Sequence, residues 1–164
     1  MKIAVISDTH VHEPDEWLAE VYGRYMAGAD VLVHCGDTTG FSVWSFFNQH
    51  PNFYAVRGNM DEWRLAQELS ERVSFEAGGL TMGAVHGHGF GRIKPDIASA
   101  LGPDHDVVFF GHTHNREWAE VNGLWLLNPG SLKASAFSAA CMAYLHVEGD
   151  GRMEPEFVNV PSRL

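Results

Sequence analysis

The sequence of 164 residues contains only two cysteines, Cys35 and Cys141, which lie far apart in the chain. Two cysteines cannot build a disulfide framework, so the sequence predicts a protein of a reducing compartment. It also lacks an apolar run long enough to cross a membrane. Its first residues form a strand-like stretch without the basic segment and cleavage site of a signal peptide. We therefore expect a cytoplasmic protein with no membrane partner.

Basic residues are scarce as well. The 11 Lys and Arg stand against 21 Asp and Glu, which gives a formal net charge of −10. This balance argues against binding to nucleic acid or anionic lipid, because neither would be attracted. The acidic balance does not exclude a small anionic substrate that is bound by a local positive centre.

Repeats and low-complexity segments are absent, and no linker separates one part of the chain from another. Hydrophobic residues make up 45% and charged residues 20%, which is an ordinary globular composition. The length suits a single core. We therefore expect one domain over residues 1–164. The aromatic content, with five Trp, would permit a dimer contact, so a homo-oligomer is left open.

Short apolar runs alternate with helical patterns in the first part of the chain. Strands are expected at residues 2–6, 30–34 and 53–57, and helices at residues 14–28 and 41–50. Continuous apolar strands that alternate with helices predict a parallel sheet covered on both faces.

The second part is richer in strands. Hairpins are expected at 73–76 with 80–85 and at 118–121 with 125–127, where Asn122-Gly123 is typical of a type I′ turn. A helix is expected at 94–101, and further strands at 107–110, 139–147 and 152–160. The fold class predicted from both parts is α/β, with two packed sheets and helices outside them.

Side chains that could bind a metal follow the apolar strands. They are Asp8, His10, Asp37, Asn59, His86, His112 and His114. Ligand sites collect at the carboxyl ends of strands in α/β sheets, so we expect one shared rim if these strands share a sheet region. Imidazole, carboxylate and amide groups without thiolate suit Mn²⁺, Fe²⁺, Ni²⁺, Co²⁺ or Zn²⁺ better than Ca²⁺ or Mg²⁺. Seven ligands are too many for one tetrahedral ion and enough for two.

The order of the motifs resembles that of calcineurin-like metallophosphoesterases. The motifs are Asp8-Thr9-His10, Gly36-Asp37, Gly58-Asn59-Met60-Asp61, His86-Gly87-His88 and Gly111-His112-Thr113-His114. The short length and the segment Asn128-Pro129-Gly130-Ser131 are similar to the small YfcE-type phosphodiesterase branch. The resemblance spans roughly residues 1–131, and five motifs in one order are far more specific than any one of them.

This resemblance implies a four-layer α/β/β/α sandwich and a two-metal phosphodiesterase, with Mn²⁺ favoured. A first ion would be bound by Asp8, His10 and His114, and a second by Asn59, His86 and His112. Asp37 would bridge the two ions. A hydroxide between the ions would attack phosphorus in line with the leaving group of a small phosphodiester substrate.

Met60 departs from the wider family, in which many members have a His here that protonates the leaving alcohol. A thioether cannot donate a proton, and the YfcE-type branch also lacks this His. His88 is ambiguous, because it could contact the substrate phosphate or only shape its loop. Together with Asp37 and Asn59 we place it in the catalytic group. We expect aryl or activated phosphodiesters to be hydrolysed more readily than alkyl monoesters.

Three alternative functions share this fold. A retromer trafficking subunit looks like it and mainly binds partners, but a scaffold could lose metal ligands that this chain retains. Nucleases of the superfamily usually carry extra binding regions, for which this chain has neither length nor basic charge. Met60 and the small size argue against a phosphoprotein phosphatase.

Several other residues are better explained by structure than by chemistry. His34 is expected in the core, and His50, His105 and His146 on the surface or in strands. Asp61 is expected to orient the Asn59 loop. Arg57 could meet a substrate phosphate or form an ion pair, and Cys35 has no partners that would make it a nucleophile.

Overall fold

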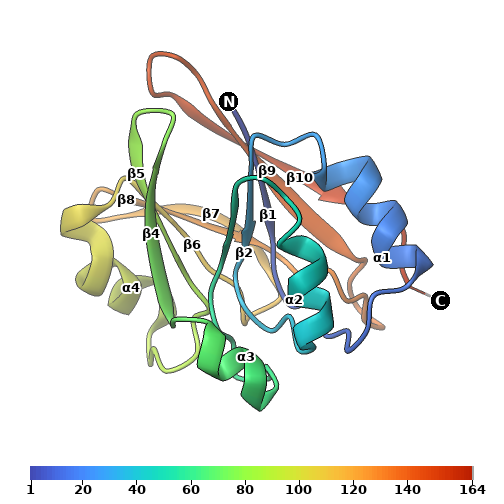
Figure 1. Cartoon of the computed structure of the whole chain (residues 1–164). Helices are drawn as coiled ribbons and strands as arrows, with labels where there is room; N and C mark the ends of the chain where they lie inside the picture. Colours follow the sequence, from blue (N-terminus) through green and yellow to red (C-terminus); the bar gives the residue numbers. More distant parts are fainter. Residues whose placement is uncertain (164) are drawn as a thin grey trace.

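A computed structural model describes residues 1–163 and arranges their strands in two five-stranded sheets (Figure 1). The first sheet has the order β10-β9-β1-β2-β3. Its central strands β1, β2 and β3 run parallel, while β9 is antiparallel to both β1 and β10. The bounds are β1 (Lys2–Ile6), β2 (Val31–His34), β3 (Phe53–Ala55), β9 (Cys141–Val147) and β10 (Met153–Asn159).

The second sheet has the order β4-β5-β6-β8-β7. Strands β5, β6 and β8 are parallel, and the edge strands β4 and β7 are each antiparallel to their neighbour. The bounds are β4 (Arg72–Ala77), β5 (Leu80–Val85), β6 (Val107–Phe109), β7 (Arg116–Val121) and β8 (Leu124–Pro129). Both sheets are therefore mixed.

Helices cover the outer faces of both sheets. Figure 1 shows α1 (Glu16–Val21) and α2 (Phe41–Phe47) beside the first sheet and α4 (Ile93–Leu101) beside the second, on opposite sides of the molecule. A π-helical turn, Tyr22–Met26, extends α1, a short α3 (Trp63–Glu68) precedes β4, and a 3₁₀ turn, Gly102–Asp104, follows α4. None of the helices in residues 1–163 has the length and apolarity needed to span a bilayer.

The core follows the two-residue alternation of buried strands. In β1, Ile3 and Val5 point between the sheets and pack with second-sheet residues such as Phe109. The alternate residues Ala4 and Ile6 pack outward against the α1 and α2 layer. A third cluster joins the second sheet to α4. The four-layer α/β/β/α arrangement predicted for the chain is thus confirmed.

The sequence-based elements differ from the observed ones at several boundaries and at one helix. Asp15, expected inside the first turn of a helix, caps it instead: the Leu18 N–H donates to Asp15 Oδ1 (2.9 Å). The helix expected at 41–50 ends at Phe47. Helix α3 was not predicted at all. The Asn122-Gly123 turn is confirmed as type I′, with φ of 54° and 85° at its two residues.

Candidate metal centre

The loops that follow the parallel strands of both sheets meet at one end of the molecule. The Asp8 N–H donates to Gly36 O (3.0 Å), which joins the loops after β1 and β2. His86 Nδ1 lies 2.7 Å from Cys35 O, and the His112 N–H donates to Asp8 Oδ2 (3.1 Å). The strands therefore divide between two sheets rather than sharing one, and their loops still form a common rim.

Each of the two carboxylates in this rim uses one oxygen to hold the loops. Asp8 Oδ2 accepts from the Ser7 hydroxyl and from the His112 N–H. Asp37 Oδ1 accepts from the Met60 N–H (2.8 Å). Both side chains are buried. The second oxygen of each carboxylate, Asp8 Oδ1 or Asp37 Oδ2, is left facing the same small space.

Three imidazole nitrogens face these two oxygens. Asp8 Oδ1 lies 3.1 Å from His114 Nε2, 3.7 Å from His10 Nε2 and 4.0 Å from His86 Nε2. Asp37 Oδ2 lies 3.3 Å from His86 Nε2 and 3.8 Å from His10 Nε2. Ligand atoms about 2.1 Å from one ion lie roughly 3–3.5 Å from each other, so these spacings suit metal coordination. Two overlapping groups of candidate ligands result: Asp8, His10 and His114, and Asp8, Asp37 and His86.

The hydrogen bonding of the two His86 ring nitrogens indicates whether a metal ion fits this space. Its Nδ1 faces the Cys35 carbonyl, which can only accept, so Nδ1 carries the proton in the neutral ring. Its buried Nε2 then presents a lone pair and has no hydrogen-bond partner within residues 1–163. A lone pair aimed at two carboxylates is unfavourable unless a cation lies between them. The residues present therefore fit a divalent ion.

The electrostatics of the site favour positive charge. Although burial opposes it, the nearby Asp37 and Asp8 raise the pKa of His86 above its ordinary value. The hydrogen bond to Asp8 raises the pKa of His114 in the same way. Burial opposes ionisation of Asp37, yet His86 and the Met60 N–H lower the pKa of that carboxyl. Divalent ions would supply this positive charge in place of protons.

Left-handed backbone is concentrated at these residues. Seven non-glycine residues of the described chain have positive φ, and five of them are predicted ligands: Asp8, His10, Asp37, His112 and His114, with φ between 51° and 69°. This conformation costs about 1 kcal/mol or more per residue, and such residues cluster at functional sites. The left-handed conformation turns these side chains from the strand ends toward the site.

Two glycines allow the loops to approach closely. A methyl group on Gly58 would overlap the Asp37 carboxylate, and one on Gly111 would overlap the Ser7 hydroxyl. Asp61, behind the same loop, accepts from the Gly58 N–H and the Thr39 N–H (2.7 Å each). It therefore orients the Asn59 loop, as expected from the sequence.

The other predicted site residues lie around the five converging side chains. The rings of His112 and His88 are centred 5.1 Å and 5.4 Å from that of His86, and the buried His88 Nδ1 has no hydrogen-bond partner among residues 1–163. Asn59 is exposed and precedes Met60, whose N–H binds Asp37. The structure thus brings five predicted ligands into contact distance, with His112, Asn59 and His88 on adjacent loops.

The histidines assigned to structural roles are mostly as expected. His34 is fully buried, and burial lowers its pKa to about 3. His146 lies in β9 beside Glu156, and Arg57 forms an ion pair with Glu71. His50 corrects the expectation of an exposed or strand residue: it is 3% exposed, outside any strand, and its Nε2 lies 3.1 Å from Ala29 O.

Sequence reasoning missed how the end of β8 and the residues that follow it support the site. Buried Asn128 donates from Nδ2 to Gly111 O and to Thr113 Oγ1 (3.0 Å each), which holds the His112–His114 loop. Ser131 Oγ lies 3.0 Å from Asp8 O. The signal was present as an Asn-Pro-Gly-Ser segment after a buried strand, but its hydrogen-bond partners are distant in sequence.

Comparisons with known proteins agree with this geometry. A family model described as a calcineurin-like phosphoesterase superfamily domain matches residues 1–150. The phosphodiesterase MJ0936 of Methanocaldococcus jannaschii is 33% identical over 145 residues, covering 79% of this chain and 83% of that protein.

Two solved structures share the fold at lower identity. A Streptococcus pneumoniae protein described as a predicted phosphoesterase superposes with a TM-score of 0.75 at 23% identity, covering 96% of this chain and 88% of the other. Vps29 of Entamoeba histolytica, solved in complex with zinc, superposes with a TM-score of 0.72 at 24% identity, covering 97% of this chain and 99% of the other.

Proposed function

Because the chain belongs to the calcineurin-like phosphoesterase superfamily, we propose that it is a phosphodiesterase that uses two divalent metal ions, Mn²⁺ foremost, with Ni²⁺, Fe²⁺, Zn²⁺ and Co²⁺ suited to the same ligands. One observation carries this proposal. Five side chains from four separate loops direct one oxygen or nitrogen each into the same space, and all of them except His86 do so from a left-handed backbone. A fold maintained only for its shape has no need of that strain.

The proposed roles keep the first ligand group and otherwise follow the family resemblance. Asp8, His10 and His114 hold one ion, and His86, His112 and Asn59 hold the other. Asp37 bridges them, since its Oδ2 faces both His10 Nε2 and His86 Nε2. When bound, the ions supply Lewis acidity and a water nucleophile at neutral pH.

Neither Met60 nor His88 is well suited to protonate a leaving group. Met60 has no proton to donate, and its side chain is 57% exposed. Burial and the neighbouring His86 lower the pKa of His88, so little of this imidazole carries a second proton to donate at neutral pH. These residues support a preference for diesters with good leaving groups, such as aryl esters.

The test is hydrolysis of bis(4-nitrophenyl) phosphate by metal-stripped protein before and after addition of Mn²⁺, Ni²⁺ or Zn²⁺. We expect activity only with metal, and two ions bound per chain by elemental analysis. Asp37→Asn removes the bridging charge and should reduce kcat by roughly 10³-fold or more while weakening both ions. Glu62→Gln, a neutralised carboxylate outside the centre, is the control. Full turnover in stripped protein or in Asp37→Asn would refute the proposal.

A second function, partner binding on the same fold, is favoured by the similarity to Vps29 along nearly the whole chain. In that case the ligand set has no catalytic use. The same experiment separates the two functions: a scaffold would show no esterase activity with any of the three metals.

A further inference from the structure

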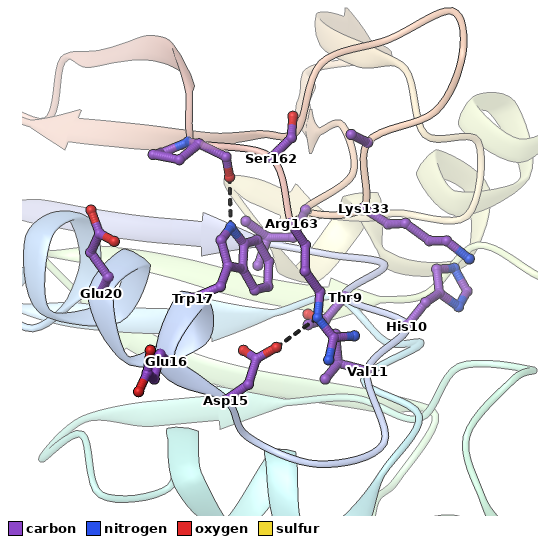
Figure 2. A pocket seen from close by; sticks show the side chains of 13 residues that line it. Thr9, His10, Val11, Asp15, Glu16, Trp17, Glu20, Lys133, Ser162 and Arg163 are labelled. Carbon is purple, nitrogen blue, oxygen red and sulfur yellow. Dashed lines mark hydrogen bonds and ion pairs between the residues drawn. The ribbon is translucent and has the colours of Figure 1, made fainter.

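A cavity of about 820 Å³ opens directly beside the candidate metal centre (Figure 2). Its walls come from the loop after β1, from α1, from residues 132–134 and from residues 161–163. His10 is shared between this cavity and the first ligand group. A substrate bound at the metal centre can therefore extend into the cavity, which is large enough for a sizeable organic group.

The cavity has a fixed wall opposite His10. Trp17 Nε1 donates to Pro161 O (2.7 Å), and Arg163 Nε donates to Asp15 Oδ2 (2.6 Å), as the dashed lines in Figure 2 show. The positive charge of Arg163 is thus neutralised by Asp15. The cavity also contains Glu16 and Glu20, so its α1 side is acidic and disfavours a second anionic group.

Among the residues that the structure describes, Lys133 is the basic residue of this cavity without a side-chain partner. The chain has 11 Lys and Arg, all within residues 1–163. Ten of them contact a carboxylate, an aromatic ring or an amide: Lys2, Arg24, Arg57, Arg64, Arg72, Arg92, Lys94, Arg116, Arg152 and Arg163. The exposed ammonium of Lys133 has no such contact in this part of the chain. In a protein of net charge −10, an unpaired cation is available to an anion.

The backbone of Lys133 is anchored to the metal centre. Its N–H lies 3.3 Å from Asp8 O and 3.0 Å from Ser131 Oγ. Figure 2 shows the Lys133 amine beside the His10 ring. Lys133 therefore lies between the centre and the cavity.

We infer that Lys133 binds an anionic oxygen of the substrate phosphate, and that the cavity receives the second organic group of the phosphodiester. This inference rests on the proposed function and specifies its substrate class: diesters whose second group is bulky and uncharged. A small second group would not fill the cavity. An anionic second group would be repelled by Glu16 and Glu20, which line the cavity. Lys133 lies outside the motifs of the sequence, which end at Ser131.

The experiment compares two substrates that share a leaving group, bis(4-nitrophenyl) phosphate and methyl 4-nitrophenyl phosphate, with Mn²⁺-loaded protein. Lys133→Met should raise KM for both by roughly tenfold, because it removes a charge-assisted contact. Lys133→Arg should restore most of the affinity. Ala134→Phe, which narrows the cavity, should raise KM for the bis-aryl ester only. Lys2→Met, with the same charge change at the opposite end of β1, is the control.

A binding measurement distinguishes failure of this inference from failure of the proposed function. If the wild-type protein hydrolyses neither ester, the proposed function fails, and titration calorimetry with diphenyl phosphate still tests the inference. Weaker binding to Lys133→Met than to Lys2→Met supports it. Equal KM values and equal binding for these two variants, or an equal effect of Ala134→Phe on both esters, would overturn it.

Discussion

In both Asp8 and Asp37, the two carboxylate oxygens have different roles. One oxygen accepts protein donors and fixes the side chain, and the other faces the imidazoles. A site held in this way is preorganised, because its ligands need little rearrangement to receive a cation. Neither oxygen could be assigned from sequence, since the backbone donors come from Met60 and His112, which are distant in the chain.

At position 60 we predict that a proton donor changes the range of substrates. Met60→His places a titratable ring on an exposed loop residue next to the site. General acids contribute about 10²–10⁴-fold when well placed, so even an imperfectly placed ring should raise kcat for phenyl esters by roughly tenfold. It should barely change kcat for 4-nitrophenyl esters. The measurement is the dependence of kcat on leaving-group pKa, with Met60→Leu as control; equal slopes for the two variants would contradict the prediction.

His34 makes stability depend on pH. Its pKa is about 3 in the folded protein, against an ordinary 6.5, because burial disfavours the charged ring. The unfolded chain therefore binds more protons between these values, and stability present above pH 6.5 is lost as the pH falls toward 3. One such group costs about 2 kcal/mol between pH 7 and pH 5.

The check is urea unfolding of the metal-free protein at these two pH values. His34→Gln can keep the hydrogen bonds to Thr9 and Gly36 without titrating. We expect its free energy of unfolding to fall by about 2 kcal/mol less than that of the wild type. A fall of the same size in both proteins would show that His34 does not carry the effect.

At the scale of elements, the loop after β6 depends on the end of β8. Asn128 belongs to neither ligand group, yet its Nδ2 donates to the carbonyl of Gly111 and to the hydroxyl of Thr113. The Gly130 N–H in turn donates to Asn128 Oδ1 (3.0 Å). The buried amide thereby fixes the loop that carries His112 and His114.

We predict that Asn128→Ala weakens metal binding by roughly 10–100-fold, the range for groups that orient ligands. It should also reduce the free energy of unfolding by about 1–3 kcal/mol, since buried partners lose their hydrogen bonds. Metal titration and chemical unfolding measure the two effects. Asn115→Ala, at an exposed position just after the same loop, is the control. Unchanged metal affinity in Asn128→Ala would contradict the role assigned to this amide.

The strands were predictable and the pairing between them was not. Apolar runs and the Asn122-Gly123 pair predict local structure, and β1, β2, β5, β6 and the second hairpin lie where expected. Helix α3 was not predicted, because it spans six residues and no side chain caps its start. The division of the parallel strands between two sheets depends on long-range packing, which cannot be predicted from local sequence patterns.

At the scale of the whole molecule, each ligand group draws on both sheets. Asp8 and His10 follow β1 of the first sheet, whereas His114 follows β6 of the second. Asp37 follows β2, whereas His86 follows β5. An ion in either group would therefore link the two sheets.

We expect metal to stabilise the whole fold accordingly. Free Mn²⁺ at 100 times its dissociation constant contributes about 2.7 kcal/mol per site, which corresponds to a rise in Tm of roughly 5–10 °C for a chain of this size. Differential scanning calorimetry of stripped and loaded protein measures the shift. Asp37→Asn should lose most of it, and an identical shift in that variant would place the stabilising ion elsewhere.

The split of the ligands between the sheets also has a consequence for biosynthesis. A nascent chain that has emerged only through β3 contains Asp8, His10 and Asp37, but lacks every histidine supplied by β5 and β6. Neither group of ligands is complete until His86 and His114 have left the ribosome and both halves have docked. Ions bound by these two groups would therefore not template early folding: they would bind a nearly finished molecule, and metal supply would act on maturation rather than on the first collapse of the chain.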